Sequence, residues 1–206
     1  MAARAGVLRL YDNAGSTNAI KTRFLLAELG LEYERIVTPI GEAAVRPAGY
    51  RAVHPFEMVP ALVDGDLTIT ESNTTLRYLA EREGRPDLRG EDPVRRARID
   101  TLLDSLSLEL RPKLWAVEEV AVYGLDAADD ERAARVAALD DALERYDALA
   151  DPDGPYLAGG FSIADCAVAG RLLNLPRLGL DATRHPRLAR AYAAATARPA
   201  WRACLT

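Results

Sequence analysis

The sequence has few of the residues that build disulfide frameworks or basic surfaces. It contains two cysteines among its 206 residues, Cys166 and Cys204, which is too few for a disulfide framework. Lysine occurs only at Lys21 and Lys113, and the arginines are scattered along the chain. The basic stripe that nucleic-acid-binding proteins carry is therefore missing, and no nucleic-acid partner is expected.

Long apolar runs are also missing. No stretch approaches the ~20 apolar residues of a membrane span, and residues 1–6 lack the apolar core of a secretory signal. We therefore expect a cytoplasmic protein with no membrane partner. What remains is ordinary for a globular chain, with 49% hydrophobic residues, 28% charged residues and a net charge of −5. The length allows one large domain or two small ones.

The chain up to residue 83 alternates strand and helix signals. The segments with strand character are 7–11, 33–38, 59–63 and 67–70. Asp64-Gly65 is a strong hairpin signal between the last two of them. Ile20, Phe24 and Ala27 recur at helical spacing, and a second helix is expected over 71–82. The stretch 39–56 is expected to be irregular. This order, β-α-β and then β-β-α, predicts a compact α/β domain.

The composition changes at residues 84–93. Four residues that interrupt regular structure fall in this segment: Gly84, Pro86, Gly90 and Pro93. We interpret it as a linker between domain 1–83 and an all-helical domain at 94–206. The expected helices run from Val94 into the region of Trp115 and Tyr123, over 129–150, from near Ser162, and through the tail to Tyr192 and Trp201.

Three motifs together resemble the glutathione transferase family. They are LGLEYE at 29–34, HPFEMVPAL at 54–62 followed by ESN at 71–73, and FSIAD at 161–165. In this order and spacing the resemblance covers essentially the whole chain. It implies a thioredoxin-like N-terminal α/β domain that binds glutathione as co-substrate. It also implies an all-α C-terminal domain that offers a pocket to a small hydrophobic electrophile, with no metal.

The resemblance also implies how glutathione is held. The Val59-Pro60 bond is expected to be cis, so that the Val59 N–H and C=O pair with the cysteinyl part of the tripeptide. Ser72 and the free N–H groups of the helix start are expected to hold the γ-glutamyl carboxylate, with Glu71 holding its ammonium group. Without the resemblance, Ser72 is interpreted as an N-cap and Pro60 as an edge or bulge residue.

The expected chemistry requires a group that stabilises the glutathione thiolate. A thiol has an unperturbed pKa of about 8.5, and one hydrogen bond to a charged group supplies about 1.5–3 kcal/mol. By position, Ser16 matches the catalytic serine of theta-like and many bacterial family members, and Asn18 matches an assisting asparagine. Tyr11 is the alternative activator, and Thr17 a further one. The simplest alternative for Ser16 is an ordinary turn or cap residue.

Two positions depart from the family pattern. Met58 stands where a Lys, Gln or Arg often helps to hold the glycyl carboxylate, and His54 stands where Asn usually precedes the proline. His54 is a candidate hydrogen-bond donor to glutathione. These changes weaken the expectation of tight glutathione binding but leave the fold prediction intact.

In the helical half, Ser162 and Asp165 have the spacing of a capping box. We interpret Asp165 as structural rather than catalytic. The substitution Asp165→Ala is expected to lower the free energy of unfolding by about 0.5–2 kcal/mol, with glutathione affinity per folded molecule unchanged.

The second-substrate pocket is expected between the first loop and the long helix. Its candidate residues are Leu108, Arg111, Leu114 and Trp115, and core packing is the alternative for each apolar one. Phe56 matches an aromatic that inserts into the partner subunit in some classes, and Arg77 matches an interface arginine. A two-fold homodimer is therefore expected. The alternative for Phe56 is a buried anchor of its own loop.

The function predicted from these residues is glutathione transfer. The thiolate attacks an electrophilic carbon of the second substrate, and the activating hydroxyl donates to sulfur. Isomerisation or peroxide reduction would use the same thiolate. The alternative from a different class is a non-catalytic binding or interaction protein that keeps this fold. The sequence names neither the electrophile nor the pathway.

Overall fold

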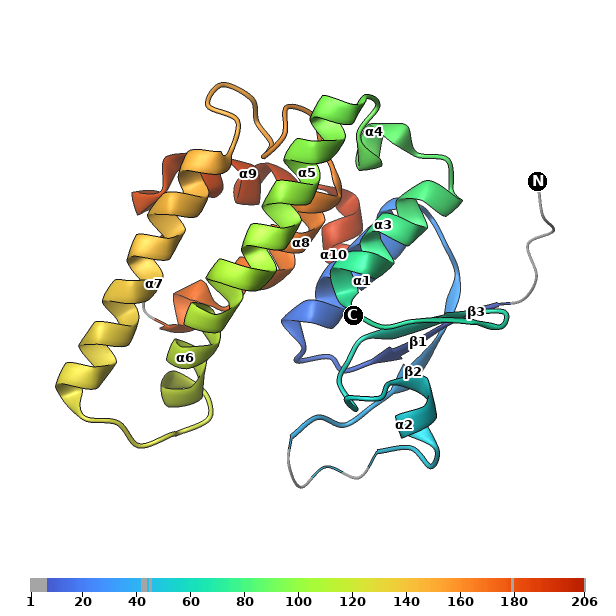
Figure 1. The fold of residues 1–206 in the computed structure, drawn as a ribbon, viewed down its shortest axis with the longest axis horizontal. Coiled ribbons are helices and arrows are strands. Elements are labelled where there is room, and N and C mark those ends of the chain that lie inside the picture. The colour runs from blue at the N-terminus through green and yellow to red at the C-terminus, as the bar shows by residue number, and fades with distance from the viewer. Residues whose placement is uncertain (1–6, 42–43, 45, 179, 206) are drawn as a thin grey trace. The chain divides into compact units, whose positions relative to one another are not determined.

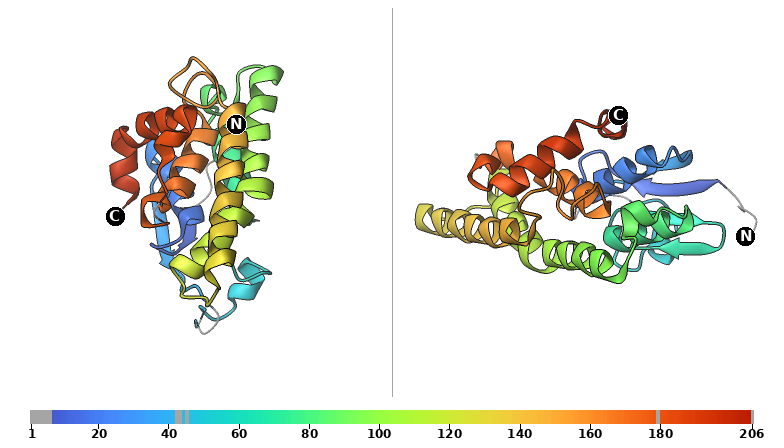
Figure 2. Two further views of the ribbon diagram at one scale, coloured as in Figure 1. Left: turned by 90° about the vertical axis from the view of Figure 1, so that its left-hand side faces the viewer. Right: turned by 90° about the horizontal axis from the view of Figure 1, so that it is seen from above.

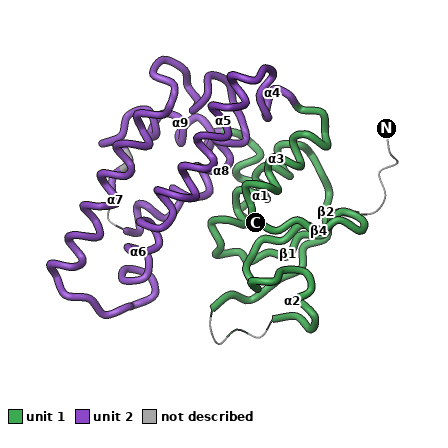
Figure 3. The backbone as a smooth tube through the Cα atoms, in the orientation of Figure 1, with its two compact units in different colours: residues 1–85, 198–206 green, residues 86–197 purple. Residues whose placement is uncertain are grey.

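The computed structural model describes residues 7–41, 44, 46–178 and 180–205. The chain divides into two compact units (Figure 3). Unit 1 comprises residues 1–85 and 198–206, and unit 2 comprises residues 86–197. The last segment, which the sequence analysis grouped with the helical half, thus belongs to the same unit as the strands.

Unit 1 is built on a four-stranded mixed sheet with the order β2-β1-β3-β4. Its strands are β1 (Leu8–Asp12), β2 (Tyr33–Val37), β3 (Ala61–Asp64) and β4 (Leu67–Ile69). Strand β1 pairs parallel with β2 and antiparallel with β3, so that Leu10 lies between Arg35 and Leu62. Gly65, with φ of 58°, makes the β3–β4 turn. The predicted thioredoxin-like order of elements is confirmed.

Helices cover both faces of this sheet. Helices α1 (Thr17–Glu28) and α3 (Ser72–Arg82) lie on one face, and the short helix α2 (Tyr50–Val53) lies on the other (Figure 1). Helix α2 falls in the stretch expected to be irregular, because a single turn has too few residues for a periodic signal. The fully buried core side chains include Leu10, Phe24, Leu25, Leu26, Leu62, Leu76 and Leu79.

The C-terminal helix α10 (Pro199–Cys204) packs against α1, as the views in Figure 2 show. The ring of Trp201 meets that of Phe24 edge-on at 5.2 Å between centroids. Arg198 forms an ion pair with Glu28 just before α10 begins. These contacts join the C-terminal segment to α1.

The described part of unit 2 is helical apart from isolated bridges at 156–160. Its helices are α4 (Pro86–Arg89), α5 (Pro93–Ser105), the π-helical turn η1 (Leu106–Leu110), α6 (Arg111–Ala121), α7 (Asp129–Leu149), α8 (Ile163–Leu172), η2 (Leu175–Leu178), η3 (Ala182–Arg184) and α9 (Pro186–Thr196). The expected all-α character is confirmed. Helix α4 lies inside the segment interpreted as a linker.

The first long helix of unit 2 departs from the prediction. It is not regular throughout, because the π-helical turn η1 separates α5 from α6. Pro112 explains the interruption. It has no N–H to donate to the Leu108 carbonyl, and in a regular α-helix its ring would clash with that carbonyl. The wider turn before it accommodates the proline.

Helix α8 begins with the predicted capping box. The Ser162 hydroxyl accepts from the Ala164 N–H at 3.3 Å, and the Asp165 carboxylate accepts from the Ser162 N–H at 2.8 Å. Asp165 also accepts from the Leu157 N–H at 2.9 Å. The structural interpretation of the motif is thereby confirmed.

No helix in the described part of the chain has the length and hydropathy needed to cross a membrane.

Candidate functional site

Ser16 is the N-cap of α1. Its hydroxyl oxygen accepts from the Ala19 N–H at 3.3 Å, and its own N–H donates to the Asn13 carbonyl at 3.0 Å. A hydroxyl has one donor besides its acceptor lone pairs, and within the described part of the chain Ser16 donates its hydroxyl proton to no other residue. The cap interpretation and the activator interpretation are thus compatible.

Asn13 holds the loop that presents Ser16. Its side-chain oxygen accepts from the Gly15 N–H at 3.0 Å, and its amide donates to the Thr38 carbonyl at 3.1 Å. The first turn of α1, residues 17–20, carries no acidic side chain. The N-terminus of this helix therefore keeps an uncompensated positive dipole end, which favours an anion.

The other proposed activators occupy different places. Asn18 lies half-buried in the first turn of α1, and Thr17 is buried there. Tyr11, on β1, turns its ring to the opposite face of the sheet, where it packs on Tyr50 of α2 at 5.2 Å between centroids. Successive side chains of a strand point to opposite faces of the sheet, so Tyr11 points to the face opposite to that of the buried Leu10. Of the hydroxyl candidates, Ser16 alone caps a helix.

The loop before β3 carries a buried histidine, His54, and an exposed aromatic residue, Phe56. His54 is buried, and its Nδ1 accepts from the Phe56 N–H at 3.3 Å. Burial lowers the pKa of His54, although the charge of Glu71 opposes this. The neutral ring then carries its proton on Nε2, as a donor. The Phe56 side chain is 79% exposed, so the alternative interpretation of Phe56 as a buried anchor is wrong.

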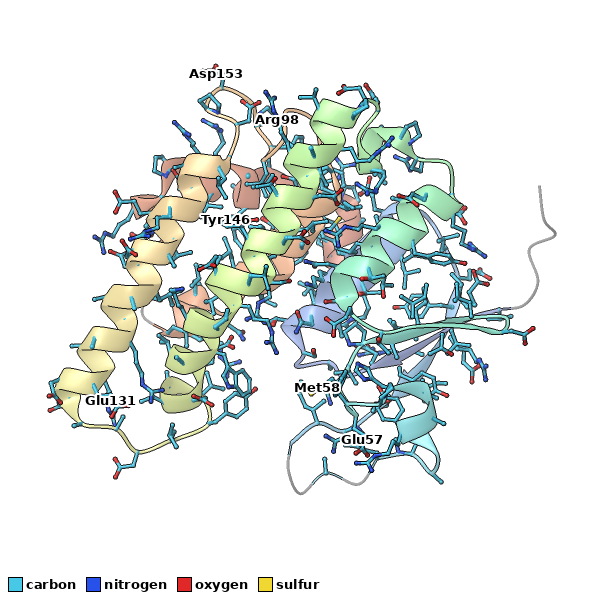
Figure 4. All side chains as sticks on the ribbon, in the orientation of Figure 1. Glu57, Met58, Arg98, Glu131, Tyr146 and Asp153 are labelled. Atoms are coloured by element: carbon cyan, nitrogen blue, oxygen red, sulfur yellow. The ribbon has the colours of Figure 1, made fainter. Side chains whose placement is uncertain are left out.

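The Val59-Pro60 peptide bond is cis, as the resemblance implies. Within the described part of the chain, no backbone hydrogen bond engages the N–H or C=O of Val59. The preceding carbonyl, that of Met58, is occupied by the Tyr50 hydroxyl. The Met58 side chain itself is half exposed, and Figure 4 shows it on the loop before β3. The backbone N–H and C=O of Val59 are therefore available to pair with an extended peptide, like those of an edge strand.

The start of α3 has an unusual backbone. Glu71 is the N-cap residue, with a φ of 61° that non-glycine residues rarely adopt, and its side chain makes no capping bond. Ser72 is the first helical residue and is buried. The interpretation of Ser72 as the N-cap is therefore wrong by one position. No acidic residue follows in the first turn of α3, which leaves its N–H groups suited to a carboxylate.

A buried lysine links the two helix starts, and the sequence analysis missed it. Lys21 of α1 is 2% exposed, and its Nζ donates to Asn73 Oδ1 of α3 at 2.7 Å. The available signal was that Lys21 lies one residue after the apolar Ile20 and three before Phe24, on a helix with a buried face, where a charge requires a polar partner.

A second buried ionic group lies beneath the Ser16 loop. Asp12, at the end of β1, is fully buried and pairs with Arg35 of β2 and with Arg23 of α1 at 3.6 Å. Arg23 also donates to the Ala14 carbonyl at 3.4 Å. These contacts hold the C-terminal end of β1 and the loop that carries Ser16 in place.

The four candidate residues for the second-substrate pocket all lie in unit 2. Leu108 and Trp115 are exposed, and Arg111 is half-buried. Leu114 is fully buried and packs in the core of unit 2, as the core alternative expected, so it is left out of the proposed pocket below. The interface candidate Arg77 lies half-buried on α3 of unit 1.

No cluster of three or more His, Cys, Asp or Glu side chains that could hold a metal ion occurs among the described residues.

Comparisons with known proteins complete the description of the site. A family model described as "Glutathione S-transferase, N-terminal domain" matches residues 6–81. Glutathione S-transferase GstB of Escherichia coli (strain K12) is 32% identical over 207 residues, which span 95% of this chain and 96% of that protein. A stringent starvation protein A homolog of Pasteurella multocida (strain Pm70) is 27% identical over 86% of this chain and 79% of that protein.

Among solved structures, the chain is similar to the theta class glutathione S-transferase of Xanthomonas axonopodis pv. citri with glutathione bound. The TM-score is 0.86 at 26% sequence identity, and the match covers 97% of each chain.

Proposed function

The chain belongs to the glutathione S-transferase family, and from this premise we propose that it is a catalytic, cytoplasmic glutathione transferase. In the proposed reaction, the thiolate of glutathione attacks an electrophilic carbon of a small hydrophobic substrate. A carbon–sulfur bond forms, and the leaving group departs with its electron pair.

The Ser16 hydroxyl is the observation that carries this proposal. It lies at the N-terminal end of α1 with its oxygen accepting from Ala19 and its proton available. A hydrogen bond to a thiolate is worth about 1.5–3 kcal/mol, which corresponds to roughly one to two pKa units. The helix dipole adds to this stabilisation. Asn18, in the same helical turn, is the proposed assisting residue.

Six further residues of unit 1 are proposed to hold glutathione. The Val59 N–H and C=O pair with the cysteinyl residue as one more strand rung, and Pro60 follows them. The N-terminus of α3 at Ser72 receives the γ-glutamyl carboxylate, and Glu71 receives its ammonium group. His54 donates through Nε2. Met58 contributes an apolar contact and no charge.

The second substrate is proposed to bind to unit 2 through Leu108, Arg111 and Trp115. Two of these side chains are exposed apolar groups and the third is a cation. Such a mixture, mostly apolar with a single polar anchor, is typical of small-molecule sites.

The substitution Ser16→Ala tests the proposed activator. We expect the pKa of bound glutathione to rise by about one to two units and kcat/KM for an aryl halide to fall about tenfold or more at neutral pH. The thiol is titrated by the ultraviolet absorbance of the bound thiolate. Tyr11→Phe is the matched control, because it also removes one hydroxyl near the end of β1.

Loss of the Ser16 cap lowers stability by about 1 kcal/mol, so the measurements use folded protein verified by circular dichroism. An unchanged thiol pKa in Ser16→Ala would rule out Ser16. If Tyr11→Phe instead raised the pKa of the bound thiol, Tyr11 would be the activator.

A second candidate function is that of a non-catalytic binding or interaction protein that keeps this fold. Met58 supports it, because a neutral side chain stands where family members often have a group for the glycyl carboxylate. One of the relatives is also named for stringent starvation rather than for a transferase activity. Retention on immobilised glutathione without turnover of any aryl halide would establish this alternative.

A further inference from the structure

Arg111 is a cation that forms no ion pair with any residue that the structure describes. It is half-buried at the first position of α6, directly after the π-helical turn. Within the described part of the chain, no carboxylate lies within ion-pair distance of it. Nearby acids are engaged elsewhere: Glu109 lies 3.6 Å from Lys113, and Glu119 lies 3.6 Å from Arg135.

Two buried ionisable groups, Glu118 and Arg171, lie close to Arg111. Glu118 lies seven residues further along α6, which places it on the same face of the helix. It is buried and accepts from the Asn174 amide at 3.1 Å. Arg171 of α8 is 4% exposed, and burial lowers its pKa; Glu118 opposes this effect and Arg111 adds to it. The guanidinium groups of Arg111 and Arg171 thus carry two positive charges, of which the single carboxylate of Glu118 can balance one.

An exposed aromatic pair is formed by Trp115 of α6 and Tyr123 of the turn that follows α6. Trp115, one turn after Arg111, is 43% exposed, and its ring lies 5.3 Å from that of Tyr123, which is 61% exposed. The indole N–H donates to Glu119 at 2.7 Å, which fixes the orientation of the Trp115 ring. Trp115 and Tyr123 therefore present two apolar ring faces, inclined at 43° to each other, and Trp115 lies one helical turn after the Arg111 cation.

We propose that Arg111, Trp115 and Tyr123 form a recognition site for electrophiles that carry a carboxylate on an aromatic frame. The guanidinium group receives the carboxylate through paired hydrogen bonds, and the aromatic rings stack on the frame. This inference rests on the proposed function, since it names the class of the second substrate. Arg111 is then the residue that selects anionic over neutral electrophiles.

The test compares two probes of similar shape, a para-chloronitrobenzoate and the corresponding para-chloronitrobenzamide. Their binding to the full chain is measured by titration calorimetry for the wild type, Arg111→Gln and Arg111→Lys. We expect the wild type to bind the benzoate about tenfold more tightly than the benzamide. This preference should disappear in Arg111→Gln and be partly restored in Arg111→Lys. Arg145→Gln, at an exposed arginine of α7, is the control and should keep the preference.

Equal binding of both probes by the wild type would overturn the inference, as would a preference that survives in Arg111→Gln. Conjugation of both probes to glutathione is measured on the same samples. A preference that depends on Arg111 without conjugation would refute the proposed function and support the anion site. Conjugation of both probes without a preference for the benzoate would support the proposed function and refute the anion site. Thermal unfolding of each variant confirms that the folded state is compared.

Discussion

At the scale of single residues, Lys21 is a buried cation of α1 whose ammonium group bonds to α3. A buried ammonium group is costly unless it is hydrogen-bonded, and Asn73 accepts from it at 2.7 Å. The pair joins α1 to α3 next to Ser72, the residue proposed to receive the γ-glutamyl group. Its contribution to the site is therefore to hold two helix starts together.

The substitution Asn73→Ala should lower the free energy of unfolding by about 1.5–3 kcal/mol, because it removes a hydrogen bond to a buried charge. Urea denaturation measures this change. Thr74→Ala, at the exposed neighbouring position, should change stability by less than about 0.5 kcal/mol. Equal effects of the two substitutions would contradict a special role for the Lys21–Asn73 bond.

At the scale of elements, the start of α8 depends on a buried carboxylate. Burial raises the pKa of Asp165 to about 6, although hydrogen bonds from Leu157 and Ser162 act in the opposite direction. The unfolded chain has a value near 3.9. Between the two values the folded state binds more protons than the unfolded state, so this group lowers stability as pH rises from about 4 to about 6.

The variant Asp165→Asn removes this titration and leaves one N–H or O–H donor of the box without an acceptor. We expect it to be less stable than the wild type, with a difference that narrows by about 2–3 kcal/mol between pH 4 and pH 6. Urea denaturation across this range measures the difference. Ser162→Ala keeps the carboxylate and removes only a hydroxyl bond that lowers its pKa, so its stability should fall with rising pH at least as much as that of the wild type. A difference that widens with pH would refute the raised pKa.

The Asp165→Ala variant should be more destabilising than cap energetics alone suggest. The carboxylate accepts from the Leu157 N–H as well as from Ser162, so its removal leaves buried donors unpaired. The expected loss is about 2 kcal/mol or more.

At the scale of the whole molecule, the chain returns at its end to complete unit 1. Trp201 is buried against Phe24, so Trp201→Ala should cost about 3–5 kcal/mol. Hydrogen exchange should show loss of protection in α1 and β1 before loss in α7. Leu205→Ala, at a half-exposed position one residue after α10, is the control. Uniform loss of protection would contradict the assignment of α10 to unit 1.

The proposed homodimer depends on Phe56, whose ring is exposed on a loop held by His54. We expect the wild type to sediment as a dimer and Phe56→Ala to shift it toward the monomer. Val37→Ala removes another strongly exposed apolar side chain, on β2, and should leave the dimer intact. A monomeric wild type would exclude the proposed interface.

The sequence by itself determined the features that depend on neighbouring residues. The strand alternation of β1, the hairpin turn at Gly65, the 129–149 helix and the Ser162–Asp165 box all follow from local spacing. The cis bond before Pro60 followed from the resemblance of its motif. Ser16 was selected because its position matches the catalytic serine of the family that the motifs resemble, and the structure shows that it is also the N-cap of α1.

Tertiary structure alone decided the rest, because burial and pairing join residues that are distant in sequence. Lys21 meets Asn73 across 52 positions, and α10 meets α1 only after unit 2 is complete. Sequence spacing also could not separate Leu114, which is buried, from Trp115, which is exposed. On one helix these neighbours differ only in which face other helices cover, and that is set by packing rather than by local chemistry.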